Sequence, residues 1–147
     1  MPQRDDTRVG GLLLAAGSST RMGKNKMLVE IHRETVLRRA AKTAVAASLD
    51  PVIVVTGHER KQAELQLDGL DCLTAFNVDH ETGIQSSVQV GVDALPDDVG
   101  AVLIMLADMP FVTTKMLCDL VALYRTTDAP LIISRYGGEV QAPPMLY

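Results

Sequence analysis

The chain has 147 residues, of which 47% are hydrophobic, and its formal net charge is −4. This length suits one domain that buries a core without disulfides or structural metal. The acidic balance argues against a nucleic-acid partner, and no apolar run reaches the roughly 18 to 20 residues of a membrane span.

Short apolar runs alternate with amphipathic segments along the chain, a pattern typical of βαβ units. The predicted strands lie at 9–16, 51–56, 72–76, 101–106 and 130–134. The predicted helices lie between them, at 34–48, 58–69, 83–96 and 113–125. Because the strand runs are almost continuously apolar, we expect an α/β fold whose mostly parallel sheet is covered by helices on both faces.

The last residues predict a glycine hairpin at 136–140, followed by another extended segment at 141–147. Because the sequence stops within that segment, we expect a single domain over residues 1–147 that lacks C-terminal elements of the full fold.

Two features of the sequence predict a cytoplasmic location. Cys72 and Cys118 lie far apart and fit no C-x-x-C spacing, which favours buried free thiols in a reducing compartment. The first eight residues are charged and include no apolar signal region.

Small residues and cations directly follow the first predicted strand. The stretch L-L-L-A-A-G-S-S-T-R-M-G-K-N-K (12–26) carries Arg21, Lys24 and Lys26 within six positions. In open parallel sheets, ligands bind beyond the carboxyl ends of the strands. Backbone amides in such a turn, together with Arg and Lys side chains, bind phosphate oxygens. The stretch therefore predicts a polyphosphate site, although a flexible, solvated basic loop is the alternative.

Two common phosphate-binding patterns do not fit this stretch. Gly17 and Gly23 are separated by five residues and Lys24 is followed by Asn25, so the spacing of a Walker A loop is broken. The G-x-G-x-x-G dinucleotide pattern is absent as well. A P-loop ATPase or kinase is therefore disfavoured.

The same stretch resembles a family signature. L-A-A-G-S-S-T-R-M-G-K-N-K-M-L (14–28) matches, at every fixed position, the pattern L-A-[AG]-G-x-[SG]-x-R-M-G-x-x-K-x-L of the MobA-like nucleotidyltransferases, closest to molybdenum cofactor cytidylyltransferases. Two later stretches are similar to further motifs of that family: N-V-D-H-E-T-G-I-Q-S-S (77–87), with Ile84 in place of Met, and L-A-D-M-P (106–110). The resemblance implies a three-layer α/β/α fold of the nucleotide-diphospho-sugar transferase type, with a Rossmann-like nucleotide-binding sheet.

The resemblance also implies a reaction and its site residues. A nucleoside monophosphate would move from a nucleoside triphosphate to a phosphate-bearing acceptor, with release of pyrophosphate and with Mg²⁺ as cofactor. Arg21 would bind the leaving pyrophosphate, Lys26 the α-phosphate, and Asp108 the Mg²⁺ ion. Asp108 follows an apolar strand, so its carboxylate, a ligand type that Mg²⁺ prefers, should emerge beside the basic loop. The alternative is an Asp that only stabilises the turn before Met109.

The expected nucleotide-binding residues come from the first two of these motifs and from the end of a second strand. The backbone from Leu14 to Gly17 is expected to read the base edge. Residues with this assignment are Leu14, Ala15, Ala16, Gly17, Gly57, Asn77, Gly83 and Ser87. The alternatives are a helix-start turn at Gly57, a turn role for Asn77 and a helix cap at Ser87. His32 and His80 lie in no metal or triad pattern and receive no role.

Within the resemblance, Ala16 favours CTP, because the guanylyltransferases tend to have L-A-G-G where this chain has L-A-A-G. A molybdopterin-type cofactor is then the expected acceptor, and a molybdoenzyme or its chaperone is a candidate protein partner. Two alternatives stay open: a sugar- or polyol-phosphate nucleotidyltransferase, and a non-catalytic nucleotide-binding or cofactor-insertion accessory domain. A second metal-binding acid is not assigned.

Overall fold

The computed structural model of the chain describes residues 6–17, 25–136 and 140–146. A six-stranded sheet in the order β5-β4-β1-β6-β8-β7 lies at its centre. The strands are β1 (Arg8–Ala15), β4 (Val52–Thr56), β5 (Leu73–Phe76), β6 (Val99–Leu106), β7 (Ile132–Tyr136) and β8 (Val140–Leu146). Neighbours among β5, β4, β1 and β6 are parallel, whereas β8 is antiparallel to both β6 and β7. The predicted mostly parallel sheet is confirmed.

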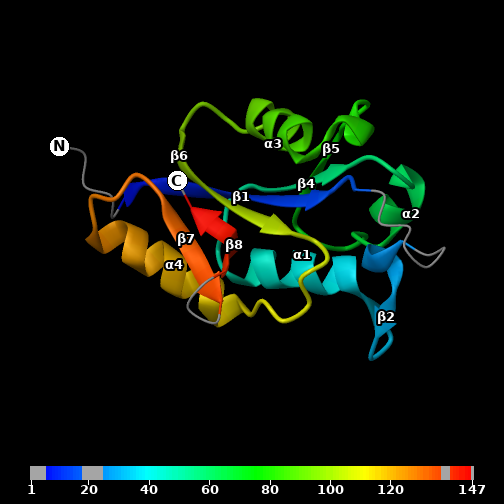
Figure 1. Ribbon diagram of the computed structural model, residues 1–147, viewed down its shortest axis with the longest axis horizontal. Coiled ribbons are helices and arrows are strands. Elements are labelled where there is room, and N and C mark those ends of the chain that lie inside the picture. The colour runs from blue at the N-terminus through cyan, green and yellow to red at the C-terminus, as the bar shows by residue number, and fades with distance from the viewer. Residues whose placement is uncertain (1–5, 18–24, 137–139, 147) are drawn as a thin grey trace.

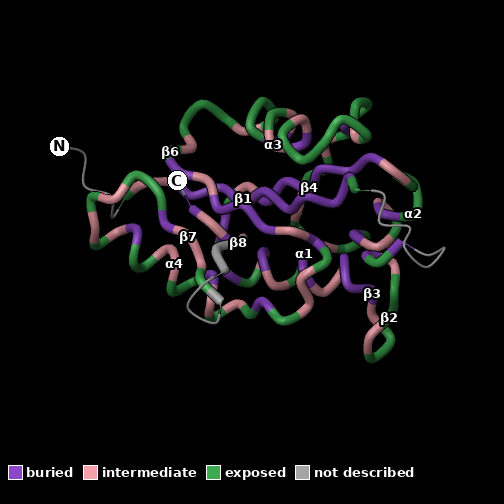
Figure 2. The backbone as a smooth tube through the Cα atoms, viewed as in Figure 1, coloured by how far each residue is buried: buried purple, intermediate pink, exposed green. Residues whose placement is uncertain are grey.

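Helices cover both faces of the sheet, which makes the predicted three-layer α/β/α arrangement (Figure 1). The helices α1 (Val36–Ala46) and α4 (Thr114–Thr126) lie on one face, and α3 (Ile84–Asp93) lies on the other. The short α2 (Arg60–Leu65) follows β4. The side chains of β1 alternate between the two layers: Leu13 packs in the α1/α4 core, and Leu12 packs in the α3 core. The central strands are accordingly buried along most of their length (Figure 2).

Three features differ from the sequence-based expectation. The strand β5 is the outermost strand, so Leu73 is 59% exposed and is not covered on both faces. A two-stranded hairpin, β2 (Glu30–Ile31) and β3 (Glu34–Thr35), precedes α1, and its second strand takes the first two residues of the helix expected at 34–48. Its strands have only two residues each, which is too short for a periodic pattern. Single-turn 3₁₀ helices, η2 (Lys26–Leu28) and η3 (His80–Thr82), were also missed.

The two cysteines are free, as predicted, but only one is shielded from solvent. Cys72 is half-buried and Cys118 is exposed on α4. Burial, with a smaller contribution from the neighbouring charge of Asp71, raises the pKa of the Cys72 thiol. Within the described residues, no helix has both the length and the apolar character needed to cross a bilayer.

Candidate active site

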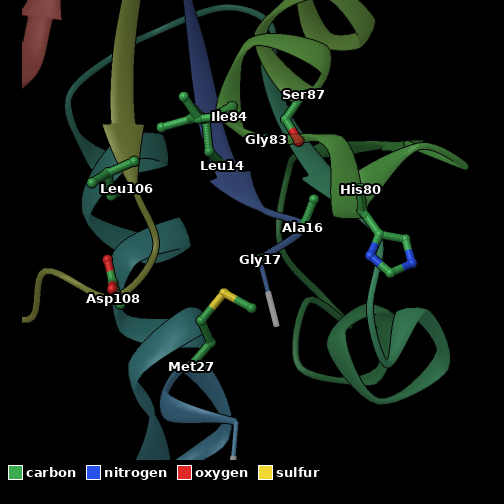
Figure 3. Close-up of a pocket in the computed structure, with 10 residues that line it drawn as sticks. All are labelled: Leu14, Ala16, Gly17, Met27, His80, Gly83, Ile84, Ser87, Leu106 and Asp108. Carbon is green, nitrogen blue, oxygen red and sulfur yellow. The ribbon is translucent and has the colours of Figure 1, made fainter. Parts of the chain in front are cut away.

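A cavity of about 240 Å³ opens at the carboxyl ends of β1 and β6, beside the first turn of α3. This is the edge at which parallel α/β sheets bind ligands. The described residues that line it are Leu14, Ala16, Gly17, Met27, His80, Gly83, Ile84, Ser87, Leu106 and Asp108 (Figure 3). All three stretches that carry the family resemblance therefore contribute to one cavity.

The end of β1 forms one wall of this cavity. Because side chains alternate along a strand, Leu14 and Ala16 belong to the α3 side, which holds the cavity, whereas Ala15 is buried in the opposite core. Backbone bonds fix this segment on both flanks: Ala107 N donates to Leu14 O over 3.1 Å and His58 N donates to Ala16 O over 3.3 Å. Of the four residues predicted to read a base, all but Ala15 line the cavity.

Asp108 lies directly beyond β6, at the opposite side of the cavity from His80 (Figure 3). Its side chain is exposed. Neither a hydrogen bond nor an ion pair engages its carboxylate within the described part of the chain. The carboxylate thus lies on the cavity with its oxygens available to a ligand.

These residues suit an ion that takes only part of its coordination from protein. Across residues 6–17, 25–136 and 140–146, no group of three or more His, Cys, Asp or Glu side chains is arranged to hold a metal. Mg²⁺ is commonly bound through one or two carboxylates, with substrate phosphates and waters as its other ligands. The single carboxylate of Asp108 fits that mode and does not fit a closed structural site.

Asn77 is not a cavity-lining residue but supports the wall behind it. Its side chain is 1% exposed, and its Nδ2 donates to Ser86 Oγ (2.9 Å) and to Ser87 Oγ (3.0 Å). Its Oδ1 accepts a hydrogen bond from Asp79 N at 3.0 Å. The amide therefore ties the segment after β5 to the first turn of α3. A nucleotide contact by Asn77 stays a prediction.

Ser87 and Gly83 both lie at the cavity, in the segment that Asn77 holds. Ser87 is buried on α3 and its hydroxyl is bonded to Asn77, so the alternative of a helix cap is wrong. The N-cap residue is Gly83, whose φ of 116° lies in a region that L side chains rarely adopt. Glycine is therefore required for the chain to enter α3 at this angle.

Gly57 lies behind the cavity and is absent from its lining. A Cβ at this position would lie 2.5 Å from His80 Cβ and 2.9 Å from Ala16 Cβ. The missing side chain lets the end of β4 pack directly against two cavity residues. Gly57 thus has a steric role behind the cavity, its contact with a nucleotide stays a prediction, and α2 begins only at Arg60.

The cationic residues of the first motif are only partly described. Lys26 begins η2 and is exposed, and its neighbour Met27 lines the cavity. The buried side chain of Asn25 fixes this turn, because its Oδ1 accepts from Met27 N at 3.2 Å. Arg21 lies outside the described residues. The convergence of Arg21 and Lys26 on the phosphates stays a prediction.

Sequence reasoning missed four lining residues: Met27, His80, Ile84 and Leu106. Three of them have apolar side chains that the sequence alone assigns equally well to a core. His80 carries a polar ring, but it lies in no spacing pattern that marks a site, and only the fold brings it to the cavity.

Replacement of Asn77 by Ala tests its supporting role. We expect the free energy of unfolding, measured with urea, to fall by about 2 kcal/mol, because buried hydrogen-bonding partners are left unsatisfied. The matched control is Gln85→Ala at an exposed position of α3, which should change stability by less than about 0.5 kcal/mol. Equal stability of the two variants would contradict the supporting role.

Comparison with known proteins finds relatives whose sequences are similar to that of this chain. The family model for the MobA-like NTP transferase domain matches residues 11–147. The bifunctional protein GlmU of Corynebacterium aurimucosum is 33% identical over 121 residues, which cover 78% of this chain and 25% of that protein. GlmU of Cutibacterium acnes is 32% identical over 118 residues, covering 78% and 28%. The chain thus spans about a quarter of the length of these curated relatives.

Solved structures share the fold over almost the whole chain. A nucleotidyl transferase from Methanothermobacter superposes with a TM-score of 0.83 at 24% identity, covering 95% of this chain and 70% of that one. Rv0371c from Mycobacterium tuberculosis gives a TM-score of 0.79 at 25% identity, covering 96% and 71%. A further structure of Rv0371c is a complex with manganese. Taken with the family match over residues 11–147, these findings show that the chain belongs to the MobA-like NTP transferase domain family.

Proposed function

We propose that this chain transfers a nucleoside monophosphate from a nucleoside triphosphate to a phosphate-bearing acceptor and releases pyrophosphate. The observation that carries the proposal is the cavity itself. It brings the backbone at the end of β1 and the available carboxylate of Asp108 to one space at the ligand-binding edge of the sheet. Membership of the family supports the same reaction.

The proposed reaction needs little proton transfer by the protein. An ionised phosphate oxygen of the acceptor attacks the α-phosphorus, the bond from that phosphorus to the bridging oxygen of the leaving group breaks, and pyrophosphate departs. Because the nucleophile is already an anion, the chain has to align the two reactants and to stabilise charge on the departing oxygens.

The three predicted catalytic residues and the end of β1 each have a role in that scheme. Arg21 binds the departing pyrophosphate and Lys26 binds the α-phosphate, since cations are needed where negative charge accumulates. Asp108 holds Mg²⁺ at the side of the cavity where it lies. The ion, when bound, neutralises phosphate charge and orients the triphosphate. The backbone of Leu14, Ala16 and Gly17 contacts the base.

CTP is the proposed donor, because Ala16 stands in the L-A-A-G form of the motif that the resemblance associates with cytidylyl and adenylyl transfer. A molybdopterin-type cofactor is the proposed acceptor. The competing acceptor class is a sugar or polyol phosphate, and the competing role is nucleotide binding without turnover.

Pyrophosphate release tests the proposal directly. The protein is incubated with Mg²⁺, each of the four nucleoside triphosphates, and either molybdopterin cofactor or a panel of sugar and polyol phosphates. We expect release with CTP and molybdopterin cofactor, and loss of that signal when a chelator removes the metal. Release with a sugar phosphate alone would replace the acceptor, and nucleotide binding without any release would overturn the reaction.

Replacement of Asp108 by Asn tests the metal-binding role. The variant keeps the side-chain shape but removes the charge, so we expect metal-dependent pyrophosphate release to fall by about 100-fold. The melting temperature should stay unchanged, because the described residues make no bond with this carboxylate. Asp97→Asn, an exposed carboxylate ahead of β6, is the matched control and should retain full activity. An active Asp108→Asn variant would show that the metal is held elsewhere.

A further inference from the structure

His80 presents a polar ring at the cavity with an unused hydrogen-bonding atom. The ring lines the cavity, and its Nδ1 is buried without a hydrogen-bond partner among the described residues. A buried polar atom of this kind destabilises the folded state when it is left unsatisfied. Most such atoms in folded proteins are paired, so the exception calls for an explanation.

The surroundings hold His80 firmly in place. Gly57, at the end of β4, packs against the Cβ of His80. A Cβ added at Gly57 would lie only 2.5 Å from that atom. The Asn77 amide holds Asp79, the residue directly before His80, through its backbone N–H. The Thr82 backbone N–H also donates to Asp79 O at 2.9 Å, which closes the turn of η3. The ring is therefore presented from a segment whose backbone is already ordered.

The position of His80 separates it from the proposed phosphate end of the cavity. Figure 3 shows Asp108 on one side and His80 on the other, with Ala16 and Gly17 next to the histidine. The lining of the cavity also includes the apolar side chains of Leu14, Ile84 and Leu106. An uncharged flat group suits these apolar side chains, whereas a triphosphate suits the side where Asp108 would hold a metal ion.

We propose that His80 is a specificity-determining residue that hydrogen-bonds the base of the bound nucleotide. A neutral imidazole offers one donor and one acceptor, and a nucleobase edge presents both kinds of group. Because Nδ1 is shielded from solvent, the ring has to turn about its Cβ–Cγ bond for a base to give this nitrogen the partner that it lacks. The inference rests on the proposed function, because it assumes that the cavity holds a nucleoside triphosphate.

Binding measurements on the full chain test the proposal. Dissociation constants for CTP, UTP, GTP, ATP and inorganic tripolyphosphate are measured with Mg²⁺ for the wild type and for His80→Phe, which keeps a ring but removes both nitrogens. We expect about a tenfold loss of affinity for the preferred nucleotide, the size of one hydrogen bond. The spread among the four nucleotides should shrink, and the affinity for tripolyphosphate should stay unchanged.

Two further variants separate a hydrogen bond from a structural effect. His80→Asn retains an amide near the position of Nδ1 and should recover part of the lost affinity and discrimination. His32→Ala, at an exposed position in the turn between β2 and β3, should behave as the wild type. If His80→Phe fails to fold, His80→Ala carries the same comparison.

Each other outcome overturns the inference. Unchanged nucleotide affinities in His80→Phe would show that the ring makes no contact with the nucleotide. An equal loss for all four nucleotides would show that it does not read the base, and an equal loss for tripolyphosphate would place it at the phosphates. If the wild type releases pyrophosphate and His80→Phe keeps its nucleotide affinities, only the inference is refuted. If the wild type binds no nucleoside triphosphate, the proposed function is refuted as well.

Discussion

The close packing at Gly57 is the constraint on which the candidate site depends. A single Cβ there would meet the Cβ atoms of both His80 and Ala16 at less than 3 Å, a separation that forces some neighbour to move. Without that atom, the end of β1 and the turn of η3 pack against the end of β4 and form one side of the cavity. Asn77 then accepts a hydrogen bond from Asp79 N in the same segment and ties it to α3 through a buried hydrogen bond to Ser87 Oγ.

The parallel sheet gives the cavity its two chemically distinct sides. Because β1 and β6 are parallel neighbours, their carboxyl ends reach the same edge, and Leu14 pairs with Leu106 at the last position of their register. Beyond that pair, β1 continues into small residues whose backbone borders the cavity, while β6 continues into the carboxylate of Asp108. In the proposed function, the uncharged and the charged halves of a nucleotide lie at these two sides.

The sequence predicted the fold well because its strongest signals are local. Apolar runs predicted the parallel strands β1, β4, β5 and β6. Leu14, Gly83 and Asp108 were found through motif spacing and do line the cavity. His80 and Gly57 could not be understood this way, because the contact between them joins positions 23 residues apart in sequence. That contact exists only once β4 has paired with β5, the strand that leads into the segment of His80.

Nuclear magnetic resonance with Mn²⁺ tests the central claim most directly, namely that one nucleotide spans the cavity from His80 to Asp108. The account predicts that a non-hydrolysable CTP analogue shifts the amide signals of Ala16, Gly17 and His80. Addition of Mn²⁺ to this complex should broaden the Asp108 signal most strongly, because paramagnetic broadening falls steeply with distance from the ion. Shifts and broadening centred instead on the separate cavity beside Arg39 and Thr113 would contradict it.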